Sequence, residues 1–394
     1  MTDQQHSNTT TEQPSSTPSS LSLLRVAIVH DWFYTRGGAE RVVEVLVDIF
    51  PQADLFALFA RPETMSPQLR SRKLTTSWLQ KIPFVHRFHR HTLMLHPFAL
   101  EQFDFTGYDL VLSSTAGTVK GVLTSTTTLH VCYCYSPMRY IWDMYSAYVR
   151  EMGPITRFVF ALTAHRVRLW DYVAAGRVDQ FACDSKYVAS RIRKYYRRES
   201  EVIYPPIDVR SIQIDDRQGD FYIAVGRLVH YKRFDLAIEA CNQLKRPLKI
   251  IGYGPDLRRL QRLAGPTIEF LGGVSDAQKH EMLGKCRALL FPGEEDFGIV
   301  PVEAQAHGRP VIAFGAGGAL ETVRGLEDDC VCTKDPTGIF FSEQTVESLV
   351  GAIERFEGCP VRFNRETIRE HAMQFDESVF RERFIEFLEH LVSR

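Results

Sequence analysis

The feature that most constrains the fold is a strand, loop and helix pattern that recurs along the chain. Residues Leu23 to Phe50 open with the β-rich run "LLRVAIVHDW" and continue as "TRGGAERVVEVLVDIF", where apolar residues are spaced by three and four. This change of period predicts a strand, a glycine loop and a helix. Further strand candidates are "ADLFALF", "YDLVLSS", "TLHVCYCY", "QFACDS" and "SEVIYPP". Repeated βα units of this kind predict a parallel sheet in an α/β fold.

The same pattern restarts in the second half of the chain. "DFYIAVGRLVHYKRFDLAIEACNQL" again predicts strand, polar loop and helix, and "PLKIIGYGPDLRRLQRLA", "TIEFLGGVSDAQKHEML", "CRALLFPG" and "PVIAFGAGG" continue the series. The connecting stretch "YPPIDVRSIQIDDRQGD" has the paired prolines and polar run of a linker. We therefore expect two Rossmann-like α/β domains, over residues 23–205 and 206–373.

The two ends of the chain differ from these domains. Residues 1–22 are rich in Ser, Thr, Gln and Pro and have neither the basic start nor the apolar core of a secretion signal, which predicts a disordered tail. Residues 374–394 carry apolar side chains at helical spacing and predict a terminal amphipathic helix. Those positions are Val379, Phe380, Phe384, Phe387, Leu388 and Leu391.

Composition excludes several functional classes. The 394 residues are long enough for two cores, and 47 Lys and Arg against 48 Asp and Glu give no overall basic field for nucleic acid. No apolar run reaches the roughly 18 residues that span a bilayer. The eight cysteines, including Cys132-x-Cys134 and Cys330-x-Cys332, show no repeated metal-ligand spacing. We expect a cytoplasmic protein with reduced thiols and no metal site.

The candidate functional residues follow the predicted strands. In open parallel sheets ligands bind outside the carboxyl ends of the strands, so two such sheets predict a cleft between the domains. Gly37 and Gly38 lie between the first strand and helix, where small residues let backbone N–H groups approach an anion. A tight turn explains them equally well. The three spaced glycines of dinucleotide-binding proteins are absent, which disfavours a dehydrogenase.

Two cations follow the strand that opens the second domain. Arg227 and Lys232 stand in "GRLVHYKRFD", directly after Gly226, and they suit a diphosphate. The alternative is a solvated loop with unrelated charges. No Asp-x-Asp occurs in the chain, so the usual carboxylate pair for Mg²⁺ is absent and the cations would take the metal's part.

Two carboxylates occur in "GEEDFGIVPVEAQAHGRPVIAFGAGGALETV". Glu295 stands in the loop after a strand, and Glu303 stands on the next helix, with seven residues between them. Carboxylates accept hydrogen bonds from the paired hydroxyls of a ribose or hexose. Glutamates near a helix start also occur for dipole reasons alone. A glycine turn at Gly317 and Gly318 follows in the same stretch.

These motifs resemble a known enzyme family. "GRLVHYKRFDLAIEA", "IGYGPDLRRL", "FLGGVSD" and "FPGEEDFGIVPVEAQAHGRPVIAFGAGGALETV" are similar to retaining, nucleotide-sugar-dependent glycosyltransferases of the two-domain GT-B type. "HDWFYTRGGAERVVE" and "YSPMRYIWD" resemble the branch of polysaccharide and lipopolysaccharide mannosyltransferases. The resemblance runs from about Leu24 to the C-terminus. It implies that the two domains face each other across a cleft, with residues 374–394 crossing back to the N-terminal domain.

The resemblance also implies roles for the site residues. Glu303 corresponds to the glutamate that binds the ribose hydroxyls, and Glu295 to the one beside the donor sugar. Arg227 and Lys232 correspond to the pair that neutralises the diphosphate leaving group. The remaining donor-site positions are all glycines: Gly37 and Gly38 in the N-terminal loop, Gly226 before the cations, and Gly317 and Gly318 in the loop that closes on the donor.

One position departs from the family pattern. Members of this branch have Cys-His-Thr/Ser-Pro-x-Arg-Tyr where this chain has "CYSPMRY", so Tyr135 occupies the place of the active-site histidine. A tyrosine hydroxyl both donates and accepts but is longer and normally neutral. Activity is then retained, altered in sugar preference, or lost. His30 lines or supports the cleft, and Arg139 and Asp143 either touch acceptor or diphosphate or form an internal ion pair.

The expected function is retaining, metal-independent transfer of a hexose, with mannose from GDP-mannose as first choice, onto a glycan or polyprenyl-linked acceptor. A UDP-sugar enzyme and a catalytically weakened nucleotide-sugar-binding protein are the alternatives. "KIPFVHRFHRHTLMLHPFALEQF" combines basic and aromatic residues, among them Lys81, Arg87, Phe84 and Phe98. Such a segment either lies on an anionic membrane surface or packs its aromatic residues into the core.

Overall fold

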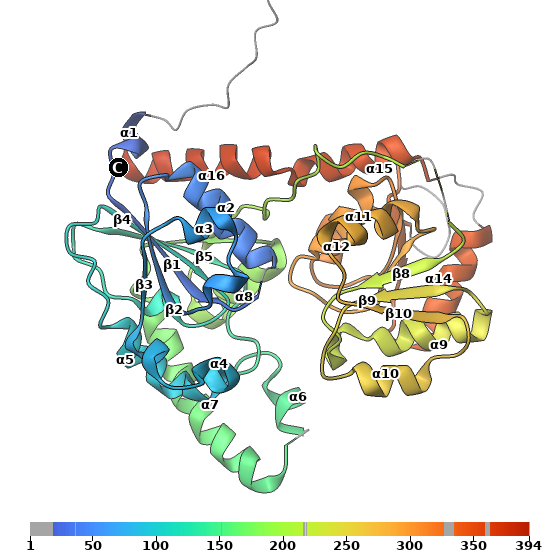
Figure 1. Ribbon diagram of the computed structural model, residues 1–394, viewed down its shortest axis with the longest axis horizontal. Coiled ribbons are helices and arrows are strands. Elements are labelled where there is room, and N and C mark those ends of the chain that lie inside the picture. The colour runs from blue at the N-terminus through green and yellow to red at the C-terminus, as the bar shows by residue number, and fades with distance from the viewer. Residues whose placement is uncertain are drawn as a thin grey trace, which may run out of the picture.

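The chain forms two α/β domains, each built on a seven-stranded sheet whose paired strands run parallel. The computed structural model describes residues 19–393 except 36, 151, 216, 218, 327–334 and 359–362. Figure 1 shows the two sheets side by side, each covered by helices, with the last helix running along one side of both domains. The predicted architecture of two parallel-sheet domains is confirmed.

The N-terminal sheet has the strand order β3-β2-β1-β4-β5-β6-β7. Its strands are β1 (Val26–Phe33), β2 (Asp54–Ala60), β3 (Leu74–Thr76), β4 (Leu110–Thr115), β5 (Leu129–Cys134), β6 (Gln180–Cys183) and β7 (Ser200–Val202). The helices are α1 (Ser19–Ser22), α2 (Gly38–Ile49), α3 (Pro67–Arg70), α4 (Val85–Phe88), α5 (His96–Leu100), α6 (Tyr145–Arg150), α7 (Pro154–Ala175) and α8 (Lys186–Tyr196). Short 3-10 helices are η1 (Pro62–Thr64), η2 (Trp78–Lys81), η3 (His89–Leu95) and η4 (Val119–Gly121).

The C-terminal sheet repeats this plan with the order β10-β9-β8-β11-β12-β14-β13. Its strands are β8 (Tyr222–Val225), β9 (Leu248–Ile251), β10 (Ile268–Gly272), β11 (Leu289–Phe291), β12 (Val311–Phe314), β13 (Gly325–Leu326) and β14 (Gly338–Phe341). The helices are α9 (Phe234–Leu244), α10 (Leu257–Leu263), α11 (Asp276–Lys285), α12 (Ile299–Ala306), α13 (Ala319–Thr322), α14 (Val346–Gly358), α15 (Arg365–Ala372) and α16 (Glu377–Val392), with η5 (His230–Lys232) and η6 (Met373–Phe375).

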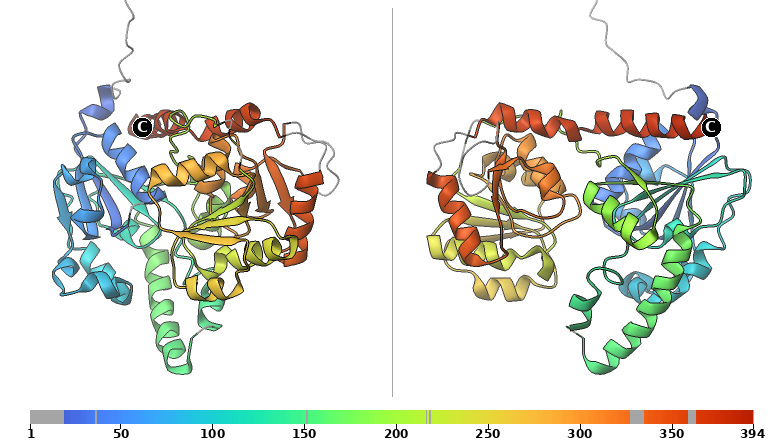
Figure 2. Two further views of the ribbon diagram at one scale, coloured as in Figure 1. Left: turned by 45° about the vertical axis from the view of Figure 1, so that its right-hand side comes forward. Right: turned by 180° about the vertical axis from the view of Figure 1, so that it is seen from behind.

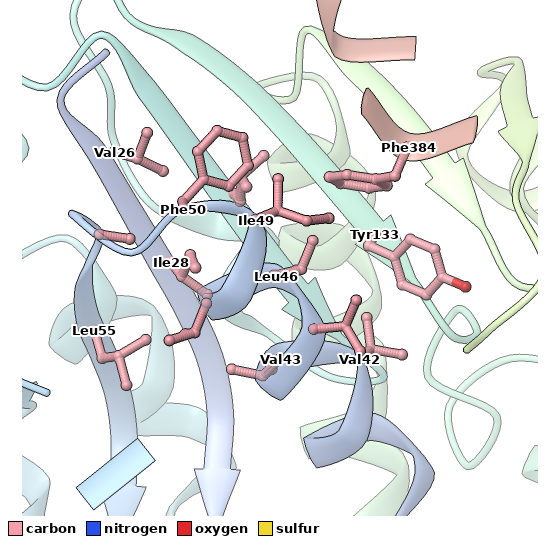
Figure 3. Close-up of a cluster of buried hydrophobic side chains, with 14 of the residues drawn as sticks. Val26, Ile28, Val42, Val43, Leu46, Ile49, Phe50, Leu55, Tyr133 and Phe384 are labelled. Atoms are coloured by element: carbon pink, nitrogen blue, oxygen red, sulfur yellow. The ribbon is translucent and has the colours of Figure 1, made fainter. Parts of the chain in front are cut away.

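Each sheet is buried on both faces, which explains why its strands are almost continuously apolar. Along β1, Val26 and Ile28 join one core cluster while Ala27 and Val29 join another, as the alternation of side chains in a strand requires. Figure 3 shows the first cluster, where helix α2 packs Val42, Val43 and Leu46 between the sheet and the last helix. In the second domain, the side chains of β8 alternate between two clusters in the same way.

The strand order places the two sets of functional loops opposite each other. In both sheets the order reverses direction at the first strand of the domain, between β1 and β4 and between β8 and β11. Loops at such a switch point form the ligand crevice of doubly wound sheets. An open cavity of about 450 Å³ is lined by residues of the first domain, among them Tyr34 and Thr35, and by Tyr253 of the second, but by none of the candidate residues. The candidate residues instead belong to the loops at the two switch points.

Helix α16 connects the end of the second domain to the first. Phe380, Phe384 and Leu388 are buried in the N-terminal core, and Phe384 approaches the Tyr133 ring with 6.3 Å between centroids (Figure 3). Arg381 adds an ion pair with Asp48 of α2, with 2.7 Å between nitrogen and oxygen. Figures 1 and 2 show this crossing from the front and from behind. The predicted return of the C-terminal helix to the N-terminal domain is confirmed.

The N-terminal end differs in detail from the predicted tail. Residues 1–18 lie outside the described residues. Ser19–Ser22 form the helical turn α1, and Leu21 is fully buried against the N-terminal core. An apolar side chain that reaches the core keeps this turn in place, so the described structure begins four residues before the predicted domain boundary.

Candidate active site between the two domains

Lys232 and Glu295 meet at the carboxyl ends of two neighbouring strands. Lys232 ends η5 after β8, Glu295 lies in the loop after β11, and Lys232 Nζ is 2.8 Å from Glu295 Oε1. Burial alone would lower the pKa of Lys232, but the Glu295 carboxylate outweighs it and raises the pKa. The lysine is therefore a partly buried cation whose charge the Glu295 carboxylate stabilises.

Two glycines make room for this lysine. Gly226 has a φ of 151°, and a Cβ atom there would lie 3.1 Å from Lys232 Nζ. A Cβ atom at Gly293 would lie 2.8 Å from Lys232 Cα. Arg227 stands next to Gly226 and is exposed, and its charge acts on Lys232 in the direction that lowers the lysine's pKa. The structure thus brings Gly226, Arg227, Lys232 and Glu295 together, as predicted.

Glu303 lies one helix further along, on α12, and is 9% exposed. Its Oε1 accepts a hydrogen bond from Lys279 Nζ of α11 at 2.7 Å. Its Oε2 is buried and has no hydrogen-bond partner among the described residues. A buried carboxylate oxygen is costly to leave unpaired, so this atom has unused capacity to accept a hydrogen bond. The sequence did not indicate the role of Lys279, because the pairing depends on how α11 packs against α12.

Gly317 and Gly318 pack directly against the loop that carries Glu295. Gly317 has a φ of 62°, and a Cβ atom there would lie 2.4 Å from the Glu295 carbonyl oxygen. The Gly318 N–H donates to the same carbonyl at 2.9 Å, and a Cβ atom on Gly318 would lie 2.3 Å from the Phe297 carbonyl oxygen. Only glycine allows the two loops to touch, so this pair fixes the backbone beneath Glu295.

The glycine loop of the first domain reaches the same place from across the cleft. Gly37 precedes α2 in an extended conformation, and Gly38 is its first residue. A Cβ atom on Gly38 would lie 2.2 Å from Ile299 Cδ1, at the start of α12. A larger residue at position 38 would require the Ile299 side chain to move.

Tyr135 and His30 belong to one hydrogen-bond network behind this loop. The Tyr135 hydroxyl donates to the Ala39 carbonyl at 2.9 Å and lies 2.7 Å from Ser114 Oγ. His30 Nδ1 lies 3.1 Å from the same Ser114 Oγ and 3.0 Å from the Ser114 carbonyl. Burial raises the pKa of Tyr135 well above its ordinary value. Both residues therefore support the first turn of α2, and the Tyr135 hydroxyl stays neutral.

Arg139 and Asp143 form ion pairs across the cleft. Arg139 Nε is 3.3 Å from Asp143 Oδ2, and Arg139 also lies 3.5 Å from Asp296, the residue after Glu295. Arg191 of α8 pairs with both Asp143, at 3.1 Å, and Asp296. Of the two predicted roles, the structure places Arg139 and Asp143 in the internal ion pair.

Further carboxylates of the second domain bind α8 of the first. The two Glu321 oxygens accept the backbone N–H groups of Lys186 at 2.9 Å and Tyr187 at 3.0 Å, which cap the start of α8. The Tyr187 hydroxyl donates to Glu294. Burial raises the pKa of Asp296, against the opposing influence of Arg139 and Arg191. The acidic run around Glu295 was visible in the sequence, but its partners lie about a hundred residues away and were missed.

The described residues contain no metal-ligand cluster, no disulfide and no membrane-spanning helix. Among them, no group of three or more His, Cys, Asp or Glu side chains is arranged to hold a metal ion. Five cysteines are described, and all are free and buried: Cys132, Cys134, Cys183, Cys241 and Cys286. Cys330 and Cys332 lie outside the described residues. No helix in the described ranges is long and apolar enough to cross a membrane. Metal independence stays a prediction.

The basic, aromatic segment forms three short helices, α4, η3 and α5. Val85, Ala99 and Leu100 are buried, whereas Phe84 and Phe98 are 66% and 64% exposed. Part of the segment thus packs into the core, as one alternative predicted, and part faces outward.

Comparison with known proteins gives a family match in the second domain. Residues 210–375 match the family model described as "Glycosyl transferases group 1". Over these residues the chain is similar to that family. This agrees with the resemblance drawn from the motifs, because Arg227, Lys232, Glu295 and Glu303 all lie within the matched residues.

Curated relatives point to mannosyltransferases. The chain is 29% identical over 219 residues to human alpha-1,3/1,6-mannosyltransferase ALG2. This alignment covers 46% of this chain and 50% of ALG2. The chain is also 29% identical over 153 residues to O-antigen chain mannosyltransferase C of Escherichia coli. That alignment covers 34% of this chain and 41% of the relative. The matches thus span half or less of these relatives.

Solved structures show the fold over nearly the whole chain. The structure of Anabaena HepE in complex with UDP and glucose aligns with 93% of this chain and 99% of its own, at 15% identity and a TM-score of 0.65. Sucrose-phosphate synthase from Thermosynechococcus elongatus aligns with 94% and 99%, at 16% identity and a TM-score of 0.68. At these identities the likeness establishes the two-domain GT-B fold.

Proposed function

We propose that this protein is a retaining glycosyltransferase that moves a hexose from a nucleotide diphosphate sugar to a glycan or polyprenyl-linked acceptor without a metal ion. GDP-mannose is the proposed donor, because two of the relatives are named as mannosyltransferases. The observation that carries the proposal is the partly buried Lys232–Glu295 ion pair at the strand ends of the second domain, together with the unpaired Oε2 of Glu303 on the helix that follows Glu295.

In the proposed mechanism, negative charge grows on the departing diphosphate. Lys232 and Arg227 stabilise that charge from fixed positions, which is electrostatic preorganisation. The Glu303 Oε2 atom accepts a ribose hydroxyl, and Glu295 accepts from the transferred sugar. The diphosphate itself helps to deprotonate the acceptor hydroxyl on the same face, so retention needs no strong protein base.

The donor is tested by a thermal-shift panel of GDP-, UDP- and ADP-sugars on the purified full chain. A ligand at 100 times its dissociation constant stabilises the folded state by about 2.7 kcal/mol. We expect stabilisation by GDP-mannose. Stabilisation by UDP-sugars with none by GDP-mannose would overturn the choice of GDP-mannose as donor. A UDP-sugar donor is the alternative, and it has support in the structural neighbour HepE, whose structure holds UDP. Release of GDP on addition of a polyprenyl-linked saccharide then measures transfer.

A second candidate is a nucleotide-sugar-binding protein with weakened catalysis. It is favoured by the Tyr135 hydroxyl, which already donates to the Ala39 carbonyl and so is not free to donate to a donor sugar. Donor binding without hydrolysis or transfer, followed by sharply increased turnover in Tyr135→His, would support this candidate.

The proposed location is the cytoplasm or the cytoplasmic face of a membrane, where a lipid-linked acceptor would be presented. Exposed Phe84 and Phe98 beside basic residues support a peripheral membrane contact. Vesicle flotation of the full chain tests it.

A further inference from the structure

Helix α7 exposes an apolar row along one face. Six large apolar side chains of this helix are 46–81% exposed and are spaced by one, three, four or seven residues, which places them on one side. We call this row the α7 stripe; it consists of Ile155, Phe158, Val159, Leu162, Leu169 and Val173. Single exposed apolar residues are ordinary, but a contiguous row marks an interaction surface.

The opposite face of α7 already has its partners. Ala164, Val167, Ala174 and Ala175 are buried against the domain, and Asp171 is buried in an ion pair with Lys120. The α7 stripe is therefore a second apolar face on a helix whose core contacts are complete. In Figures 1 and 2 the helix extends from the N-terminal domain beyond the rest of that domain.

The charges around the stripe have one sign. Asp171 is the only acidic residue of α7, and it is buried. His165 and Arg166 are exposed, and Arg166 lies within the stripe between Leu162 and Leu169. A long arginine side chain beside apolar residues keeps its charge at a polar boundary while its stem lies on the apolar surface. This arrangement complements an anionic surface with an apolar layer beneath it.

The core-facing side of α7 packs on the segment that the sequence singled out. Leu93 of η3 lies in one cluster with Ala164 and Val167 of α7. The exposed Phe84 and Phe98 flank that segment. The stripe itself extends about 27 Å from Ile155 to Val173 at 1.5 Å per residue, a length suited to a helix lying in a membrane interface.

We propose that the α7 stripe binds the surface of a bilayer that contains anionic lipids, with α7 lying in the interface and Arg166 among the headgroups. The occupant is lipid because the surface joins a long apolar row to the exposed basic residues His165 and Arg166, and because α7 has no exposed carboxylate. The inference rests on the proposed function only in that a lipid-linked acceptor gives the contact a purpose.

The test is flotation of the full chain with vesicles of phosphatidylcholine alone and of phosphatidylcholine with phosphatidylglycerol. The variant Phe158→Ser/Leu162→Ser removes two stripe side chains that make no core contribution. Leu23→Ser is the matched control, since Leu23 is 86% exposed and lies before β1, outside α7. We expect wild type and control to float with the anionic vesicles, and the double variant to lose about tenfold or more in partitioning, because each side chain contributes hydrophobic transfer.

Two results would overturn the proposal. The first is unchanged flotation of the double variant. The second is a wild-type dimer in light scattering that the same substitutions convert to a monomer, because a second copy of the chain would then cover the stripe. Calorimetric titration with GDP on the same samples separates this inference from the proposed function. Flotation without GDP binding contradicts only the donor site, and GDP binding without flotation contradicts only the α7 stripe.

Discussion

At the scale of single residues, the strongest prediction concerns Lys232. Lys232→Ala removes the partly buried cation proposed to stabilise the leaving group. We expect the activation free energy of turnover to rise by about 2–4 kcal/mol, as for loss of one preorganised donor. Steady-state kinetics with the donor that the thermal-shift panel selects checks this. Lys249→Ala is the control, because Lys249 pairs with Glu269 on β9 and β10 and has no contact with the cleft loops. Equal turnover of Lys232→Ala and wild type would contradict the assignment.

A second prediction for a single residue concerns the Tyr135 hydroxyl. Tyr135→Phe removes bonds to the Ala39 carbonyl and Ser114 Oγ, so we expect a loss of about 1–3 kcal/mol in the free energy of unfolding, the usual cost of an unsatisfied buried partner. Urea denaturation measures it, with Tyr148→Phe on α6 as an exposed control. Unchanged stability with lost donor affinity would instead mean that the hydroxyl acts on the donor.

Residue patterns predicted the donor side of the site better than its surroundings. Gly226, Lys232 and Glu295 are close in space because each follows a strand of one sheet, and strand ends are visible in the sequence. Arg191 and Asp296 pair across 105 residues, and only the packing of one domain on the other brings them together. Leu21 was assigned to a tail because composition says nothing of one apolar side chain that reaches a core.

At the scale of elements, the start of α8 is an interdomain contact. Glu321 of α13 caps α8 from the other domain, and a carboxylate at a helix N-terminus contributes about 0.3–2 kcal/mol. We expect Glu321→Gln to weaken the contact that holds α8 of the first domain against the second domain, which we call the closed arrangement. The radius of gyration in small-angle scattering should then increase.

The matched control for that change is Glu347→Gln, which alters an exposed glutamate in the first turn of α14. Addition of GDP should restore the wild-type radius in Glu321→Gln if donor and cap favour the same closed arrangement. Identical scattering of all three proteins would show that the cap has no part in holding the domains together.

At the scale of the whole molecule, α16 couples the unfolding of the second domain to that of the first. Phe380 and Phe384 complete a core whose other members come from the first domain. We expect Phe384→Ala to cost about 3–5 kcal/mol, the range for truncating a buried Phe. Denaturation followed by near-UV circular dichroism checks this, and Phe387, which is only partly buried, offers a milder control as Phe387→Ala.

Acid stability is set by buried histidines in both domains. Burial lowers the pKa of four described histidines to about 4, and these are His96, His130, His307 and His371. Their ordinary pKa is about 6.5, so between pH 6.5 and 4 the unfolded chain binds these protons first. Stability is therefore complete above pH 6.5 and falls as the pH drops toward 4.

Asp184 and Asp296 oppose this trend, because burial raises the pKa of each carboxyl and the folded state then binds the proton more readily than the unfolded state. Four histidines outnumber two carboxyls, so the free energy of unfolding should still decrease on acidification. Urea denaturation between pH 7 and 4 measures the slope of the free energy of unfolding against pH.

His130→Gln, at a fully buried position beside Ser113, should flatten this slope by up to one proton, whereas the exposed-site change His86→Gln should leave it unaltered. A slope that is the same in His130→Gln would mean that this histidine is already protonated in the folded protein.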